Sequence, residues 1–233
     1  MFANPTIDTR IHPFKALKAV GQLLSNPEDT RQVFNIFRAM RGRSGLRAFN
    51  RFAASPEGAR LLQRRPSLLA TLQDRDCLVN LPAGSMGRAY LAFMDEENLS
   101  ADGLVAASQG WEADPVPAEM DFYRARMRDA HDLTHILTGY GRDPLGEICL
   151  LAFMYAHTRN RGMALIVGMS WLKLSGVARQ AVAEAWRNGR KAAWFQNQNY
   201  EALLARPLED VRRDLDIVAP TRYAAVVSAA ARA

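Results

Sequence analysis

The sequence is divided into short segments by the residues that begin and end helices, and this feature most limits its fold. Pro13 precedes residues 14–24, whose apolar side chains recur at the three- and four-residue spacing of an amphipathic helix. Ser55, Pro56 and Glu57 place an N-cap, a first-turn proline and a first-turn acid in the order that begins a helix. Strand signals, such as alternating Val, Ile and Thr runs bounded by Asn-Gly turns, are nearly absent. The sequence therefore predicts an all-α fold.

Loops separate the expected helices without dividing the chain into domains. Residues 26–30 predict a turn, and Gly42 predicts the end of the helix that follows it. Residues 110–117 are the best place for a sub-boundary, but this stretch is too short for a flexible linker. No internal repeat stands out. We therefore predict one multi-helix domain over residues 1–233, with its core at about residues 14–223 and frayed ends.

The composition is that of a globular protein that needs no covalent cross-links. Hydrophobic residues make up 48% of the chain and charged residues 23%, so a core of useful size is expected. Cys77 and Cys149 are the two cysteines, and they lack CxxC spacing. They indicate neither a disulfide framework nor a zinc finger, which suits a reducing compartment.

The net charge of +6 narrows the classes of partner. The 30 Lys and Arg residues are scattered rather than gathered in a run that follows a phosphate backbone, so nucleic acid is not expected as a partner.

Residues 1–10 lack the apolar run of a signal peptide. The strongest apolar stretch, residues 163–172, is far shorter than the ~20 residues of a spanning helix. We expect a protein that is not integral to a membrane.

Two histidines one helical turn apart suggest a metal site. A helical pattern runs from Met120 through Ala130 into His131 and His135, whose i, i+4 spacing stacks both imidazoles on one face. Such a pair can bind a single ion. Asp132 is rotated by roughly 100° from His131 on a helix. It could reach the metal obliquely or through water, or it could orient a histidine.

A glutamate follows at the start of the next expected helix. Asp143 and Pro144 provide an N-cap and a first-turn proline, which places Glu147 in the first turn. Gly139 ends the preceding helix, and the short connection predicts a helical hairpin. Two nitrogens and one or two carboxylates would then converge and leave coordination positions open. This set suits catalytic zinc, or iron of the two-His-one-carboxylate type.

Other interpretations of these residues remain open. A histidine on a helix is commonly only solvated, and an Asp beside it often only caps or pairs. Two of the four histidines, however, share this one turn. His157 is expected near a helix end, where a cation suits the dipole, and we favour a structural role for it. A metallohydrolase would normally show further distant ligands, and only His12 and His157 remain for them.

The motif resembles the signature of the coenzyme Q biosynthesis protein 4 family, in which HDxxH is followed after eleven residues by Glu, here His131 to His135 and Glu147. Other segments also resemble the family in the family order, so that the resemblance covers roughly residues 14–223. These segments are residues 26–30, 81–87 with Tyr90, 206–212, and 217–220 with Tyr223.

The resemblance implies an all-helical fold and a metal held by residues matching His131, Asp132, His135 and Glu147. That metal is usually taken as zinc, with iron or another divalent metal as alternatives. The implied activity is that of a carbon–carbon lyase in ubiquinone biosynthesis. It would remove the C1 carboxylate from a prenylated 4-hydroxybenzoate derivative, with or without coupled hydroxylation. A non-catalytic prenyl-lipid-binding scaffold that organises other ubiquinone-synthesis enzymes is the alternative.

The resemblance also implies partners: a polyprenylated aromatic substrate, the pathway's other enzymes and a membrane surface contacted peripherally. An apolar cavity would hold the prenyl tail, and Met154, Met163 and Met169 beside Phe153 and Trp171 could line it. An ordinary helical core explains these residues equally well. The amphipathic segment with Lys15 and Lys18 could likewise lie on an anionic bilayer or pack inward. Ala- and Arg-rich composition suggests a bacterial protein on the cytoplasmic side of the inner membrane, and apolar helical surfaces suggest a homodimer.

Overall fold

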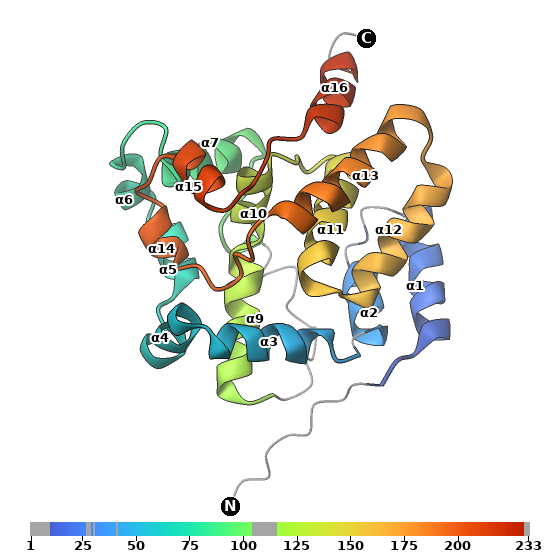
Figure 1. Ribbon diagram of the computed structural model, residues 1–233, viewed down its shortest axis with the longest axis horizontal. Helices are drawn as coiled ribbons and strands as arrows, with labels where there is room; N and C mark the ends of the chain where they lie inside the picture. The colour runs from blue at the N-terminus through green and yellow to red at the C-terminus, as the bar shows by residue number, and fades with distance from the viewer. Residues whose placement is uncertain (1–9, 27–28, 30, 41, 104–115, 231–233) are drawn as a thin grey trace, which may run out of the picture. The chain divides into compact units, whose positions relative to one another are not determined.

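The described part of the chain is helical. The computed structural model describes residues 10–26, 29, 31–40, 42–103 and 116–230 (Figure 1). Over these ranges no strand is formed, and the only β-type pairing is an isolated bridge between Ser85 and Pro207. The all-α prediction is therefore confirmed. None of the helices in these ranges is both long and apolar enough to cross a bilayer.

The chain gathers into two compact units, each made of separate stretches of sequence. Among the described residues, unit 1 contains residues 46–137 and 194–215. Unit 2 contains residues up to Gly45, residues 138–193 and residues from Asp216. The sub-boundary expected at residues 110–117 falls largely outside the described residues. The prediction of a single domain stays a prediction.

Short capped helices make up unit 1. Ser55 accepts a hydrogen bond from the backbone N–H of Gly58, and Ser85 accepts one from Arg88, so both serines cap the helices that follow them. The helices are α3 (Ser44–Ala54), α4 (Pro56–Arg64), α5 (Leu68–Gln73), α6 (Arg75–Val79), α7 (Met86–Glu96), α9 (Ala118–Asp129), α10 (His131–Thr138), α14 (Tyr200–Leu203) and α15 (Leu208–Asp214).

Two kinds of contact fix α9 within unit 1. Tyr123 packs against Phe52, with ring centroids 4.9 Å apart. The guanidinium of Arg126 is buried and donates to both carboxylate oxygens of Glu201, at 2.8 and 2.7 Å, and to the carbonyl of Gln198. Because a buried charge without its partner is strongly destabilising, this pair fixes α9 to the residues around α14.

Unit 2 is a group of longer helices. They are α1 (Pro13–Ser25), α2 (Arg31–Ala39), α11 (Pro144–Thr158), α12 (Arg161–Lys173), α13 (Gly176–Lys191) and α16 (Thr221–Ala230). One core cluster joins Ala19 and Val20 of α1 to Ile36 of α2 and Ile166 of α12. Met169 packs against the same cluster. The segment expected to line a lipid groove thus contributes to an ordinary core here, and the apolar lipid-binding cavity stays a prediction.

The helices expected from the sequence are found, with one difference. α1, α2, α4 and α7 begin and end close to the expected residues, and Gly42 follows α2 with a φ of +51°. The pattern expected to run as one helix through Ala130 is instead two helices, α9 and α10, which follow one another in Figure 1. Ala130 has a ψ of 1°, which departs from helical geometry and starts a new helix at His131.

Both cysteines are free, as expected: Cys77 is exposed and Cys149 is buried.

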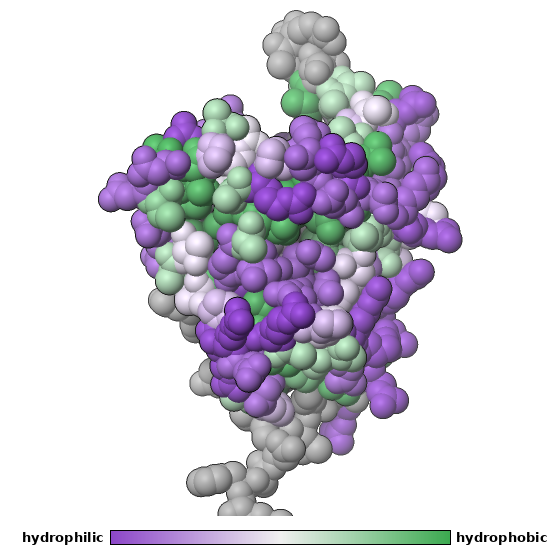
Figure 2. Space-filling view, turned by 60° about the vertical axis from the view of Figure 1, so that its left-hand side comes forward, coloured by the Kyte–Doolittle hydropathy of each residue, from purple (hydrophilic) through white to green (hydrophobic). Residues whose placement is uncertain are grey.

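Figure 2 shows one face of the molecule, on which hydrophilic residues surround smaller hydrophobic areas. This distribution matches the scattered charges of the sequence.

The close contact of α13 with α11 gives a test of the packing in unit 2. A Cβ atom at Gly189 would lie 2.4 Å from the carbonyl oxygen of Phe153, which is backbone and cannot move aside. We expect Gly189→Ala to lower the free energy of unfolding by about 1–3 kcal/mol. Gly168→Ala is the matched control, because nothing lies within 4 Å of its Cβ position, and it should raise stability by roughly 0.5–1 kcal/mol. Urea unfolding measures both, and equal stability of the two variants would contradict the packing.

Candidate metal centre

The two histidines of α10 face each other. Their Nε2 atoms lie 3.3 Å apart, and the ring planes are inclined at 84°. Two nitrogens bound to one zinc ion at about 2.0–2.1 Å in tetrahedral geometry would lie about 3.3–3.4 Å apart. The observed separation of His131 and His135 therefore fits shared coordination of one ion.

Unit 1 supports His135 from its other side. The side chain of His135 is buried, and Phe93 of α7 stacks on its ring with centroids 5.9 Å apart and an interplanar angle of 22°. His131 is only half-buried. This environment keeps water away from one imidazole and leaves the other accessible, so an ion bound by the pair would be reachable from solvent.

Glu147 completes a possible ligand group. His131, His135 and Glu147 can each offer one ligand atom, and together they are compatible with a metal-binding site. Two imidazoles and one carboxylate are a donor set that binds zinc or non-haem iron with positions left open. The group is compatible with a metal, and the donors alone do not select which one.

Asp132 is not a member of this group of three. Its charge acts on Tyr90 of α7: burial raises the pKa of the Tyr90 hydroxyl, and the negative charge of Asp132 raises it further. Asp132 therefore lies near Tyr90 of α7, and the roughly 100° rotation between neighbouring helix positions separates its direction from that of His131. Its role as a ligand stays a prediction, as do the ligand roles of His131, His135 and Glu147.

The connection between α10 and α11 is built around Asp143. Gly139 ends α10 with a φ of +74°, as its position predicted. One carboxylate oxygen of Asp143 accepts from the N–H groups of Leu145 and Gly146, which caps α11 in the turn that carries Glu147. The other oxygen accepts a hydrogen bond from the hydroxyl of Tyr223 in α16.

Tyr223 also reaches the loop itself. Its hydroxyl accepts a hydrogen bond of 2.9 Å from the backbone N–H of Gly141. A Cβ at Gly141 would lie 2.5 Å from this hydroxyl, so a larger residue would require the Tyr223 side chain to shift. Burial raises the pKa of Tyr223, and the hydrogen bond to Asp143 raises it further, so the phenol stays a donor across the physiological range.

Burial likewise raises the pKa of Cys149, in the second turn of α11, to about 12.

Several residues with no role in the sequence-based site contribute to it. No local sequence pattern indicated the roles of Phe93 and Tyr223, because their contacts with His135 and with Asp143 join distant parts of the sequence. Arg212 of α15 donates to the last carbonyl groups of α10. His157, by contrast, lies in the last turn of α11 with its ring stacked on Phe153, and it is not part of the ligand group.

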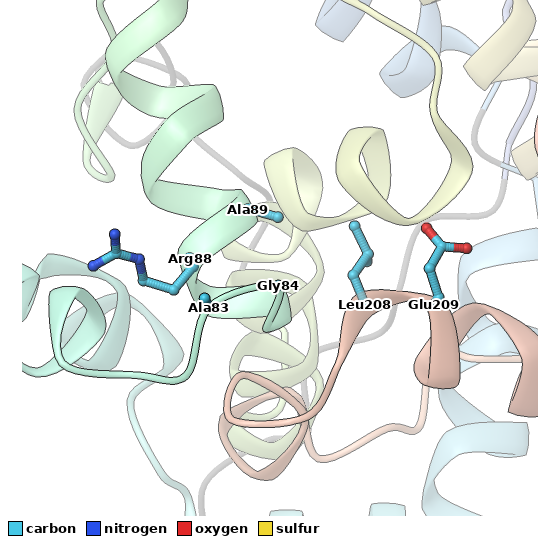
Figure 3. A pocket seen from close by; sticks show the side chains of 6 residues that line it. All are labelled: Ala83, Gly84, Arg88, Ala89, Leu208 and Glu209. Carbon is cyan, nitrogen blue, oxygen red and sulfur yellow. The ribbon is translucent and has the colours of Figure 1, made fainter.

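A shallow hollow in unit 1 lies at the start of α7 and is not the metal site. The Arg88 side chain extends away from the other lining residues, whereas Leu208 and Glu209 lie side by side and point the same way (Figure 3). Ala83 and Gly84 complete its lining, and neither histidine of α10 belongs to it. A lining in which Leu208 is the one large apolar residue does not match the long apolar groove that a prenyl tail needs.

Comparison with known proteins identifies the family. Residues 15–221 match the model of the family described as "Coenzyme Q (ubiquinone) biosynthesis protein Coq4". The chain belongs to the Coq4 family. The prediction made from the HDxxH motif is thus confirmed, and the metal-ligand candidates all lie within the matched residues.

Individual relatives of this Coq4 chain agree. It is 34% identical over 170 residues to the "Ubiquinone biosynthesis protein COQ4 homolog, mitochondrial" of Bos taurus, and 32% identical over 170 residues to "Ubiquinone biosynthesis protein COQ4, mitochondrial" of Yarrowia lipolytica. Each match covers 71% of this chain. The chain spans only 62% and 63% of the length of those two relatives.

A solved structure supports the fold. A crystal structure of a Nostoc punctiforme protein at 2.85 Å resolution superposes with a TM-score of 0.62 and 21% sequence identity. The match covers 89% of this Coq4 chain and 99% of that protein. At this identity the likeness supports the helical fold alone.

Zinc binding tests the centre. We expect the metal-free chain to bind one equivalent of zinc. Loss of a residue that only hydrogen-bonds to a metal ligand weakens metal binding by ~10–100-fold. His135→Ala should weaken zinc binding by more than that, because it removes a proposed ligand itself. Competition with a chromophoric chelator measures the affinity. His12→Ala is the matched control, since His12 is exposed and lies outside the ligand group. Equal affinity of the parent and His135→Ala would contradict this site.

Proposed function

We propose that this chain acts in ubiquinone biosynthesis as a metal-dependent carbon–carbon lyase that removes the C1 carboxylate of a prenylated 4-hydroxybenzoate derivative. His131, Asp132, His135 and Glu147 are the proposed metal ligands, with zinc as the first choice and iron or another divalent metal as alternatives. The observation that carries the proposal is the pair of imidazole nitrogens 3.3 Å apart, inside the part of the chain that matches the family.

The donor set fits a metal that keeps open positions. When bound, a divalent ion supplies a Lewis acid that neutralises the charge of the substrate carboxylate or phenolate. His131 and His135 would hold it through Nε2, and Glu147 through a carboxylate oxygen. A structural zinc site is normally closed by four protein ligands, so four-coordinate zinc would keep an open position here only if Asp132 acts as the acid and the two histidines and Glu147 bind the ion. The half-buried position of His131 supports a site that substrate can reach.

A proton donor is also required. The bond between ring carbon C1 and the carboxylate breaks, CO2 leaves, and the electron pair that remains at C1 takes up a proton. We propose Asp132 as the acid if it is not a firm ligand, since it follows His131 directly on α10. This non-oxidative step needs no co-reactant. Coupled hydroxylation at C1 would additionally need dioxygen, and because zinc has no redox chemistry, it would favour iron or direct reaction with an activated phenolate.

The proposed partners follow from this chemistry. They are the polyprenylated aromatic substrate, other ubiquinone-synthesis enzymes, a membrane surface and a second copy of the chain, and the proposed location is the cytoplasmic face of a bacterial inner membrane. The side chain of Phe14 on α1 is 86% exposed and that of Leu17 is 50% exposed. Lys15 follows Phe14 in the sequence, and Lys18 follows Leu17. Apolar side chains flanked by cations support contact with an anionic bilayer.

Turnover tests the proposal directly. We expect the metal-loaded parent to release CO2 from a short-tail prenylated 4-hydroxy-3-methoxybenzoate presented in lipid vesicles. His135→Ala should be slower by at least about 100-fold, because metal-assisted charge stabilisation supplies several kcal/mol. The His12→Ala control should match the parent.

The rival function predicts a different result. If the chain is a non-catalytic prenyl-lipid-binding scaffold, the parent will retain the prenylated compound tightly and release no CO2 with zinc, iron or manganese. That outcome would overturn the lyase proposal in favour of the scaffold.

A further inference from the structure

Arg212 of α15 is bound to the C-terminal end of α10. Its Nε donates to the carbonyl oxygen of Leu137 at 3.0 Å, and its Nη2 donates to that of Ile136 at 2.6 Å. Its Nη1 donates to the carboxylate of Glu209 at 2.6 Å. All three guanidinium nitrogens are thus engaged, and the Arg212 side chain is only 19% exposed.

These carbonyl groups need an external partner. The last four carbonyl groups of an α-helix have no donor within the helix. α10 is only eight residues long and ends at Thr138, so Ile136 and Leu137 belong to this group. A guanidinium at this end satisfies two of the orphan acceptors, and its positive charge also complements the helix dipole.

The position of α10 matters because it carries the paired histidines. A helix of eight residues is far below the length at which helices are stable in isolation. Its geometry must therefore come from contacts with other elements. Phe93 of α7 contacts the ring of His135, and Arg212 fixes the backbone of the two residues that follow His135.

We infer that Arg212 is a positioning residue for the metal centre: its fork of donors holds the last turn of α10 so that the Nε2 atoms of His131 and His135 stay at the separation that one ion requires. The inference rests on the proposed function only in requiring that this pair binds a metal. It does not depend on which reaction follows. Arg212 itself does not contact the ligand atoms, so its effect is on metal affinity through the backbone of α10.

Arginine is the residue type that suits this task. Its planar guanidinium presents donors in a fixed fork, whereas a lysine ammonium is a compact charge on a flexible stem. Arg212→Lys keeps the charge at the end of α10 but loses the geometry that binds two adjacent carbonyl groups. Arg212→Met removes both. Arg213 is the matched control, because it is the next residue on α15, is 70% exposed, and forms an ion pair with the exposed carboxylate of Asp210.

Zinc affinity of the folded protein is the measurement, with helical circular dichroism used to confirm folding at the temperature of the assay. We expect Arg212→Met to weaken zinc binding by about 10–100-fold, as loss of an outer partner does at metal sites. Arg212→Lys should lie between Arg212→Met and the parent, and Arg213→Met should stay within about 2-fold of the parent.

The outcomes separate this role from simple stabilisation. Unchanged zinc affinity in folded Arg212→Met would overturn the inference, even if the variant unfolds at lower urea concentration. If Arg212→Met does not fold, Arg212→Lys decides in its place, and parent-like affinity in that variant would overturn the inference. If Arg212→Met weakens zinc binding while the parent releases no CO2, the role of Arg212 is supported and the lyase proposal fails. Absence of zinc binding by the parent would overturn both.

Discussion

Two imidazole nitrogens on α10 lie 3.3 Å apart, and the contacts around α10 hold them at this separation. The i, i+4 spacing places both rings on one face, but an eight-residue helix cannot maintain that arrangement alone. The ring of Phe93 therefore packs on His135, and the carbonyl groups beyond His135 accept from Arg212. The proposed metal site would depend as much on what holds the helix as on the ligands.

Helix α11, which carries Glu147, is fixed by similar means. Asp143 caps α11 with one carboxylate oxygen and accepts from Tyr223 with the other, so the turn that carries Glu147 is tied to α16. Tyr223 also binds the loop through the N–H of Gly141. The C-terminal stretch thus supplies one contact to each helix: Arg212 to the end of α10 and Tyr223 to the beginning of α11. This gives a physical reason why two segments distant from the HDxxH motif accompany it.

Local features of the site could be predicted from the sequence, and distant contacts could not. The His131–His135 spacing, the Asp143 cap and the Gly139 terminus each follow from chemistry within one turn, and each is found. Arg212 and Leu137, in contrast, are 75 positions apart, and no periodicity in one sequence pairs such residues. The division at Ala130 was also missed, because alanine carries no signal for ending a helix. Family resemblance indicated the metal and the pathway, which no local pattern could specify.

The most direct test of this account is the location of zinc in a crystal of the metal-loaded protein, measured by anomalous diffraction above the zinc edge. We expect one peak per chain at about 2.0–2.2 Å from Nε2 of His131, Nε2 of His135 and a carboxylate oxygen of Glu147. A fully loaded protein whose zinc lies elsewhere, for example at exposed Cys77, with the two imidazoles left unbound, would contradict it.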